Sequence, residues 1–214
     1  MVIATQLITL NTTKVGDKSL VVHALSRELG RRSFIASAGR NAALFQPMNI
    51  LDTEVLENPK SELWRLRAVV PAHPLGGIRG NIHKNAITMF LAELLFRSIK
   101  EGACEPGLYE WCVSQILALD AQEDGFANFH LRFLMEFAAA LGFSPSTEDL
   151  LPFADANAAK IADLLSAPAE AFNLYPLNGR ERGEIAESFL RYLSYHLDYP
   201  LNIRSLRVLS ELYR

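Results

Sequence analysis

Cysteine is scarce in this chain of 214 residues, which contains only Cys104 and Cys112. Two thiols are too few for a four-thiolate metal cluster, and one possible pair makes no disulfide framework. No two of the five histidines have the spacing that would place two metal ligands on one face of a helix. The sequence therefore predicts free thiols, no bound metal and no cofactor.

Long apolar runs and an export signal are also lacking. No run approaches the ~18–20 apolar residues of a membrane span, and residues 1–10 have no positive start, apolar block or small-residue cleavage site. A composition that is 50% hydrophobic and 21% charged excludes a disordered tail and is enough for one large domain or two small ones. We therefore expect a folded cytoplasmic protein with no membrane partner.

Sequence patterns typical of catalysis are missing. There is no glycine-flanked serine nucleophile, no cysteine in a polar setting, and no glycine-rich phosphate loop that ends in Lys-Ser or Lys-Thr. The carboxylates follow solvated helix faces instead of interrupting an apolar wall. The sequence predicts that the protein is not an enzyme and has no catalytic residues; a hydrolase assembled from scattered polar residues is a weaker alternative.

Charge is divided unevenly along the chain. Residues 1–84 have eleven Lys and Arg against six Asp and Glu, a balance of +5, and residues 85–214 have ten against eighteen, a balance of −8. A basic part and an acidic part usually bind different partners. The basic part is the candidate for binding nucleic acid.

The basic part has the pattern of short strands, because β-branched and aromatic runs alternate with turn residues. We expect strands near Ile3–Leu10, Ser19–Leu25, Ser33–Ser37, Met48–Leu56 and Leu63–Val70. Five short strands predict a small barrel. In the fifth strand one face carries Trp64, Leu66, Ala68 and Val70. Burial of that face would expose Arg65 and Arg67 on the other.

Helices are expected after a joint at Pro71–Gly80, where prolines and glycines interrupt regular structure. Beyond it the hydrophobic period changes from two to about 3.6, and Asn81 can cap the first helix. The expected helices cover Asn81–Gly102, Pro106–Leu119, Phe126–Gly142, Ala158–Leu165, Glu184–Leu197 and Ser205–Tyr213. The third is apolar nearly all round, which is typical of a helix in the middle of a bundle.

Cations in the basic part fall at expected turns and on one strand face. The candidate DNA-binding residues are Lys14, Lys18, Arg31, Arg32, Arg40, Arg65 and Arg67, with Arg27 beside the second turn. Phe34 or His23 offers a ring on which a base could stack. The alternative is an ordinary solvated surface with Phe34 in the core.

Several ordered segments resemble a known family. They are LFQPMNIL (Leu44–Leu51), NIHKNAITMFLAELLFRSIKE (Asn81–Glu101) and ANFHLRFLMEFAAALGFSP (Ala127–Pro145). The stretch LSRELGRRSF, the following Gly39–Arg40, and the closing segments RYLSYHL and NIRSLRVLSELY agree with them. Together they resemble the RecO family of bacterial recombinational repair proteins over most of the chain.

The resemblance implies an α+β fold with an N-terminal five-stranded OB-type β-barrel (1–75), a linker (76–80) and an all-α helical domain (81–214). It also implies binding without catalysis. Family members bind single- and double-stranded DNA, anneal complementary strands coated by single-strand-binding protein, and with RecR help load the RecA recombinase. Gly30, Arg31, Gly39 and Arg40 lie in the matched turns.

The sequence departs from the family in one large feature. Many members have four cysteines in two Cys-x-x-Cys pairs before the last helices, and this sequence has none between Phe143 and Tyr175. We therefore expect a metal-free segment at 146–179 where the zinc module would be.

The resemblance further implies a site for the acidic, aromatic-ended tail of single-strand-binding protein. Such a tail needs a hydrophobic slot beside a cation, and we predict this site at Phe129, Arg132 and Phe133 in the third helix. The alternative for Arg132 is an internal ion pair with Glu136. An alternative for the whole protein is a non-catalytic interaction scaffold, in which the helical domain docks a partner and the barrel is only a cap.

Overall fold

The structure, a computed structural model, describes residues 1–213. The side chains of Arg40 and Asn41 are outside the described part, and the DNA-binding prediction for Arg40 falls there. The chain divides into two compact units. The first comprises Met1–Gly76 with Ala92–Ala118, and the second comprises Gly77–Leu91 with Leu119–Arg214.

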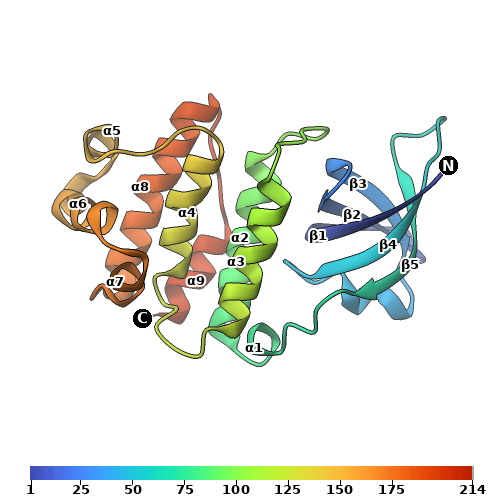
Figure 1. Ribbon diagram of the computed structural model, residues 1–214, viewed down its shortest axis with the longest axis horizontal. Coiled ribbons are helices and arrows are strands. Elements are labelled where there is room, and N and C mark those ends of the chain that lie inside the picture. The colour runs from blue at the N-terminus through green and yellow to red at the C-terminus, as the bar shows by residue number, and fades with distance from the viewer. Residues whose placement is uncertain (214) are drawn as a thin grey trace. The chain divides into compact units, whose positions relative to one another are not determined.

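The first unit contains a closed barrel of five strands (Figure 1). The strands are β1 (Val2–Val15), β2 (Ser19–Ser26), β3 (Gly30–Ser37), β4 (Ile50–Leu56) and β5 (Trp64–Pro71). Their order around the barrel is β1-β2-β3-β5-β4, and only β3 and β5 pair in parallel. A 3-10 helix, Arg40–Leu44, lies between β3 and β4. The expected α+β fold, an OB-type barrel followed by helices, is confirmed.

The barrel core follows the alternation of the strands. Its centre is formed by Leu7, Val22, Phe34, Leu51 and Val55, all 0% exposed. Because Phe34 points into this core, its ring has no surface on which a base could stack. The base-stacking prediction for Phe34 was therefore wrong, and the core alternative is correct.

Strand β5 departs from simple alternation at Ala68, whose φ is 48°. The register against β4 shifts here, so that Ala68 and Val69 together lie opposite the single residue Thr53. Leu66 and Val69 are consequently buried, whereas Val70 is 52% exposed. The prediction that Ala68 and Val70 face inward was wrong because it assumed an uninterrupted strand.

The first helices are α1 (Gly76–Arg79), α2 (Ile82–Ser98) and α3 (Leu108–Ala121). The cap expected at Asn81 is present: its Oδ1 accepts hydrogen bonds from the backbone N–H groups of His83 (2.9 Å) and Lys84 (3.2 Å). The division between the two units passes through both α2 and α3. No helix within residues 1–213 is long and apolar enough to span a membrane.

The second unit continues with α4 (Phe129–Ala140), α5 (Thr147–Leu150), α6 (Ala158–Ser166), α7 (Ala169–Leu174), α8 (Gly179–Leu197) and α9 (Ser205–Leu212). Two 3-10 turns, Leu151–Phe153 and Asp155–Asn157, precede α6. Helix α4 packs against α7 and α8, and α8 packs against α9 (Figure 1). Phe129, Phe133 and Phe137 on α4 are 0% exposed, as expected for a helix inside a bundle.

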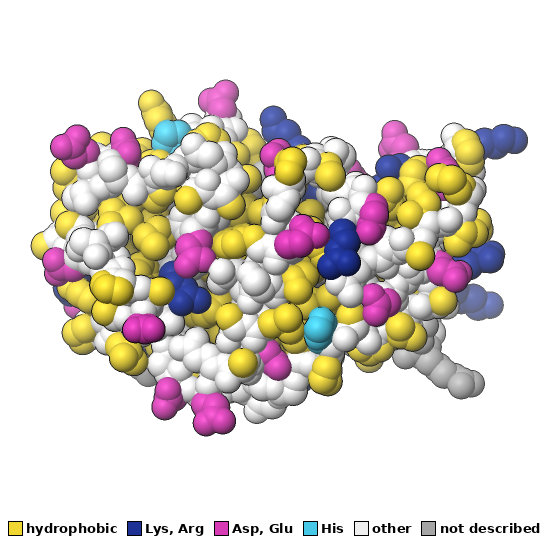
Figure 2. Space-filling view, in the orientation of Figure 1, with side chains coloured by type: hydrophobic (Ala, Val, Ile, Leu, Met, Phe, Trp, Pro, Cys, Tyr) yellow, Lys and Arg dark blue, Asp and Glu magenta, His cyan; other side chains and the backbone are white. Residues whose placement is uncertain are grey.

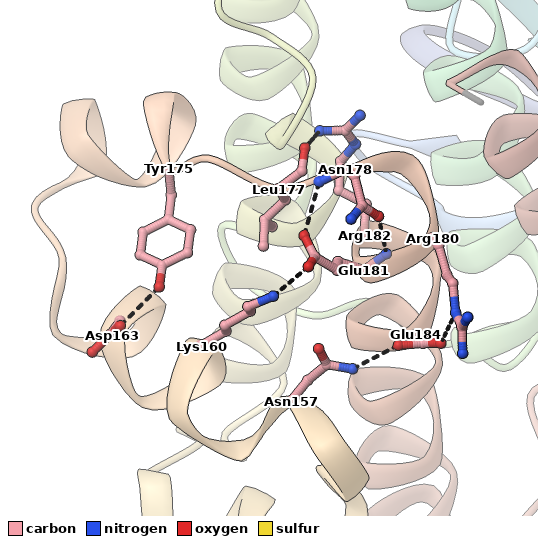
Figure 3. Close-up of polar contacts among 10 residues, drawn as sticks. All are labelled: Asn157, Lys160, Asp163, Tyr175, Leu177, Asn178, Arg180, Glu181, Arg182 and Glu184. Atoms are coloured by element: carbon pink, nitrogen blue, oxygen red, sulfur yellow. Dashed lines mark hydrogen bonds and ion pairs between the residues drawn. The ribbon is translucent and has the colours of Figure 1, made fainter.

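A polar network fastens the segment at 146–179 to the start of α8 (Figure 3). The Lys160 ammonium forms an ion pair with Glu181, and Asn157 Nδ2 donates to Glu184 Oε2 (2.9 Å). Asn178 and Glu181 form a capping box, each side chain accepting from the other's backbone N–H. Among the described residues no three His, Cys, Asp or Glu side chains are grouped in a way that could hold a metal ion. The side-chain contacts of Lys160 and Asn157 hold this segment to α8.

Candidate nucleic-acid interface

Arg31 is buried by a segment of its own unit. Its guanidinium lies 4.8 Å from the Phe96 ring, and Nη1 donates to Glu101 Oε2 at 2.8 Å. The side chain is only 8% exposed. Arg31 is therefore held in a structural ion pair that the sequence did not reveal, because its partner lies 70 residues away. Its predicted contact with DNA stays a prediction.

His23 shares this buried environment. Its Nδ1 lies 2.8 Å from Ser33 Oγ, and its ring centroid is 5.0 Å from that of Phe96. Burial, together with the positive charge of Arg31, lowers the pKa of His23, so that the neutral form is favoured. The His23 ring is half-buried and already packs on Phe96, so only part of it is exposed.

Arg32 belongs to the inner face of β3, since it pairs with Ala24, a core residue. Its guanidinium lies 3.7 Å from the centroid of the Trp64 ring. This stacked pair covers part of the barrel core, against which Trp64 packs. Arg32 remains half-buried, so packing on Trp64 is the principal contact of this side chain.

Lys14 and Lys18 lie exposed on the hairpin that joins β1 and β2. The hairpin is tied to the end of β3, because the backbone N–H of Ala38 donates to the carbonyl of Lys18 at 3.0 Å. Ser19 also pairs with Ser37 on β3. Lys18 is therefore held at the end of β3, and Lys14 lies on β1 at the same hairpin.

Arg65 and Arg67 are exposed on the outer face of β5, as expected from alternation. Arg65 pairs with Leu56 on β4 and with Ile35 on β3, whereas Arg67 pairs with Glu54. The carboxylate opposite Arg67 partly offsets its charge, and Arg65 has no acidic cross-strand neighbour. Arg65 is therefore the better placed of the two to bind a phosphate.

Arg27 is exposed but lies 3.4 Å from Glu110 in an ion pair. The other exposed cations of the barrel form what we term the cation face, consisting of Lys14, Lys18, Lys60, Arg65 and Arg67. Figure 2 shows Lys and Arg side chains on the surface of the barrel, at the right of the view. Within the described part of the chain, none of the five has an ion-pair partner within 4.0 Å. Lys60 was not predicted, although its place in the turn Asn58–Ser61 is a signal of exposure.

The predicted tail-binding residues on α4 form a packed cluster. Phe129 and Phe133 are 0% exposed, and the Arg132 guanidinium lies 5.2 Å from the Phe129 ring. Arg132 Nε is 3.4 Å from Glu136 Oε1, which is the internal ion pair given as the alternative. These residues present no open slot, because α4 is surrounded by other helices of its unit.

A hydrophobic slot does exist elsewhere in the same unit. The cavity between α8 and α9 has a volume of about 430 Å³, and we term it the α8–α9 slot. Its apolar lining is Leu190, Leu201, Ile203 and Leu206, with Arg191 and Arg204 at its side. Arg191 bonds to Asp155 at 2.5 Å. Arg204 is exposed, and no ion pair to another described residue occupies it.

Comparison with known proteins agrees with this architecture. Residues 1–75 match the family model described as Recombination protein O N terminal, and residues 79–151 match Recombination protein O C terminal. A protein of Phocaeicola vulgatus named DNA repair protein RecO is 32% identical, over 96% of this chain and 97% of its own length. This chain belongs to the RecO family.

Other members are similar over the same extent. A DNA repair protein RecO of Bacteroides fragilis is 30% identical over 96% of this chain and 97% of its own length. One of Flavobacterium psychrophilum is 29% identical over the full length of both chains. The C-terminal RecO family model ends at residue 151, so most of the segment at 146–179 lies beyond it.

Proposed function

We propose that this protein acts in DNA repair as a recombination mediator that binds single- and double-stranded DNA through the cation face of its barrel. In this role it anneals complementary strands and, with RecR, helps to load a recombinase onto DNA coated by single-strand-binding protein. It performs these steps by binding, without a reaction of its own. Membership of the RecO family supports the repair role.

The observation that carries the proposal is the set of exposed, unpaired cations on one barrel. Phosphate contacts from Lys and Arg bind the DNA backbone and leave the base edges free. A protein that anneals two strands needs this kind of contact, since the bases must remain available for pairing. The cation face provides phosphate contacts that do not depend on the DNA sequence.

The test is a salt titration of binding to fluorescent single-stranded DNA. Replacement of Arg65 and Arg67 by Ala should weaken binding for all sequences equally and flatten the salt slope by roughly 0.7 for each lost phosphate contact. The matched control is Arg180→Ala with Arg207→Ala, which removes the same charge from two side chains that are 87% exposed in the other unit. Equal affinities of the two double variants would favour the interaction-scaffold alternative.

We further propose that the α8–α9 slot binds the acidic, aromatic-ended tail of single-strand-binding protein. Its leucines can receive an apolar terminal side chain, and Arg204 can bind the terminal carboxylate. Arg204→Ala should weaken binding of a tail peptide, while Arg207→Ala, which removes a cation already paired with Glu211, should not. Arg132→Ala in the same assay tests the placement on α4. If only Arg132→Ala lost peptide binding, with its fold intact, the tail-binding site would lie on α4 and not in the α8–α9 slot.

A further inference from the structure

Aliphatic side chains cross the outer face of the barrel in one row, interrupted by a single arginine. Strand pairing aligns Val2 with Leu56, Leu56 with Arg65, Arg65 with Ile35, and Ile35 with Val21. Their sequence neighbours, among them Val55, Leu66 and Phe34, point into the core, so this row points outward. Outward positions of an antiparallel sheet usually carry polar residues. Packing of the barrel core does not explain the row.

The middle of the row, Leu56, Arg65 and Ile35, lines a cavity with a volume of about 430 Å³. The cavity is lined by Ile35, Leu56 and Leu63, with Asn58, Ser61 and Arg65 around them. Its volume lies within the range of roughly 300–1,000 Å³ that is typical of small-molecule sites. An apolar floor with a few polar groups at its edge suits a flat, partly polar ring.

The loop between β4 and β5 holds the polar groups in place before any ligand arrives. Asn58 Oδ1 accepts from the backbone N–H of Lys60 at 3.1 Å, and the backbone N–H of Ser61 donates to the carbonyl of Asn58 at 3.0 Å. Asn58 Nδ2 has no acceptor among the described residues and remains a donor. The loop is therefore preorganised, and its free amide can bind the edge of a ring.

Charge at the cavity favours an anionic ligand. Glu57, the one carboxylate in the lining, lies 3.9 Å from the terminal ammonium of Met1, which offsets its charge. Arg65 lies in the lining and Lys60 in the loop above it. A nucleotide has the matching chemistry, since its base is flat and its phosphate is negative.

We propose that this cavity, which we term the base pocket, receives one unstacked base of single-stranded DNA. Ile35, Leu56 and Leu63 contact the base, Asn58 Nδ2 donates to an acceptor on its edge, and Arg65 binds an adjoining phosphate. The base pocket rests on the proposed DNA-binding function and adds to it a contact that depends on the base. It predicts a preference for unpaired strands, because a base in a duplex cannot reach the cavity.

The experiment compares two fluorescent oligonucleotides of the same length, one of thymidine and one with abasic sites throughout. Both carry the same phosphates, so a difference in affinity reports contacts with bases. The wild-type chain should bind the thymidine strand at least about fivefold more tightly, because a base that packs on aliphatic side chains removes apolar surface from water. Asn58→Ala and Leu63→Gln should reduce this ratio toward one and leave the affinity for the abasic strand unchanged.

Val70→Gln is the matched control, since Val70 is an exposed aliphatic residue on the neighbouring strand β5 and does not line the cavity. It should keep the wild-type ratio. Asn58 is an exposed loop residue, so Asn58→Ala decides the question if Leu63→Gln fails to fold. Equal wild-type affinity for the two strands, or an unchanged ratio in both pocket variants, would overturn the base pocket and leave the proposed function intact. Absence of binding to either strand would overturn both.

Discussion

Arg31 Nη1 and Glu101 Oε2 lie 2.8 Å apart in an ion pair that joins β3 to the segment after α2. The backbone adds two bonds beside it, from Arg31 N–H to the carbonyl of Ala103 (2.9 Å) and from Gly102 N–H to the carbonyl of Arg31 (2.8 Å). Burial alone would raise the pKa of Glu101, but the hydrogen bonds from Ser33 and the charge of Arg31 outweigh it and lower the pKa. The ion pair and the two backbone bonds attach the segment after α2 to β3 within the first compact unit.

Replacing either member of this pair should destabilise the protein. Arg31→Met and Glu101→Gln should each lower the free energy of unfolding by about 1–3 kcal/mol, because a hydrogen bond to a charged group is lost and its partner remains partly buried. Urea unfolding measures this change. The DNA affinity of folded Arg31→Met should stay within about twofold of wild type. A stable variant with weakened DNA binding would support the prediction that Arg31 contacts DNA.

Gly30 is required by its surroundings as well as by its backbone. Its φ is +64°, and a Cβ built there would lie 2.3 Å from the carbonyl oxygen of Ala103. Gly16 has φ +63° with nothing within 4 Å of a built Cβ, so it is a matched control. Gly16→Ala should lower the free energy of unfolding by only about 1–2 kcal/mol, through backbone strain. Gly30→Ala should lower it clearly more. Equal losses in thermal unfolding would show that the approach of Ala103 is unimportant.

His130 should make the protein sensitive to acid. Burial, with a smaller contribution from the charge of Arg182, lowers its pKa from 6.5 to about 3. Between these values the unfolded chain binds a proton that the folded chain does not, so stability falls as the pH falls. From pH 7 to pH 5 this one group should remove about 2 kcal/mol of stability.

The check is urea unfolding of wild type and His130→Gln at both pH values. The variant lacks the titrating group, so its stability should fall less over this interval, whatever its stability at pH 7. An identical pH dependence in the two proteins would contradict a lowered pKa for His130.

The contact between α6 and α8 should depend on Glu181. Glu181→Gln removes the charge that pairs with Lys160 but retains a side chain that can complete the cap with Asn178. Amide hydrogen exchange should therefore increase in α6 and remain unchanged at the start of α8. Glu211→Gln, which breaks an exposed pair with Arg207, is the control and should leave α6 unaffected. Wild-type protection of α6 in Glu181→Gln would refute a role for the ion pair.

The segment at 146–179 should remain folded against α8 without a bound metal. Because side-chain contacts fasten it to α8, a chelator should leave the unfolding midpoint unchanged. A fall in the midpoint with EDTA, reversed by zinc, would contradict this prediction.

Local pattern determined much of this protein. Alternation predicted the barrel and the exposure of Arg65 and Arg67, helical period predicted the buried phenylalanines of α4, and the Asn81 cap followed from its position. Each of these features depends on residues within a few positions of one another, which is the distance over which a strand or a helix repeats. The ordered segments were also enough to indicate the RecO family.

Tertiary structure decided which cations remained exposed and able to bind DNA. From the sequence, Arg31 and Arg65 are both expected to be exposed. In the structure Glu101 and Phe96 cover Arg31. The alternation of a strand cannot predict contacts with residues so far away in the sequence. The bulge at Ala68 redirected Val70 because one added residue reverses the facing of all that follow. The α8–α9 slot and the base pocket likewise combine side chains from separate elements, which come together only when the chain folds.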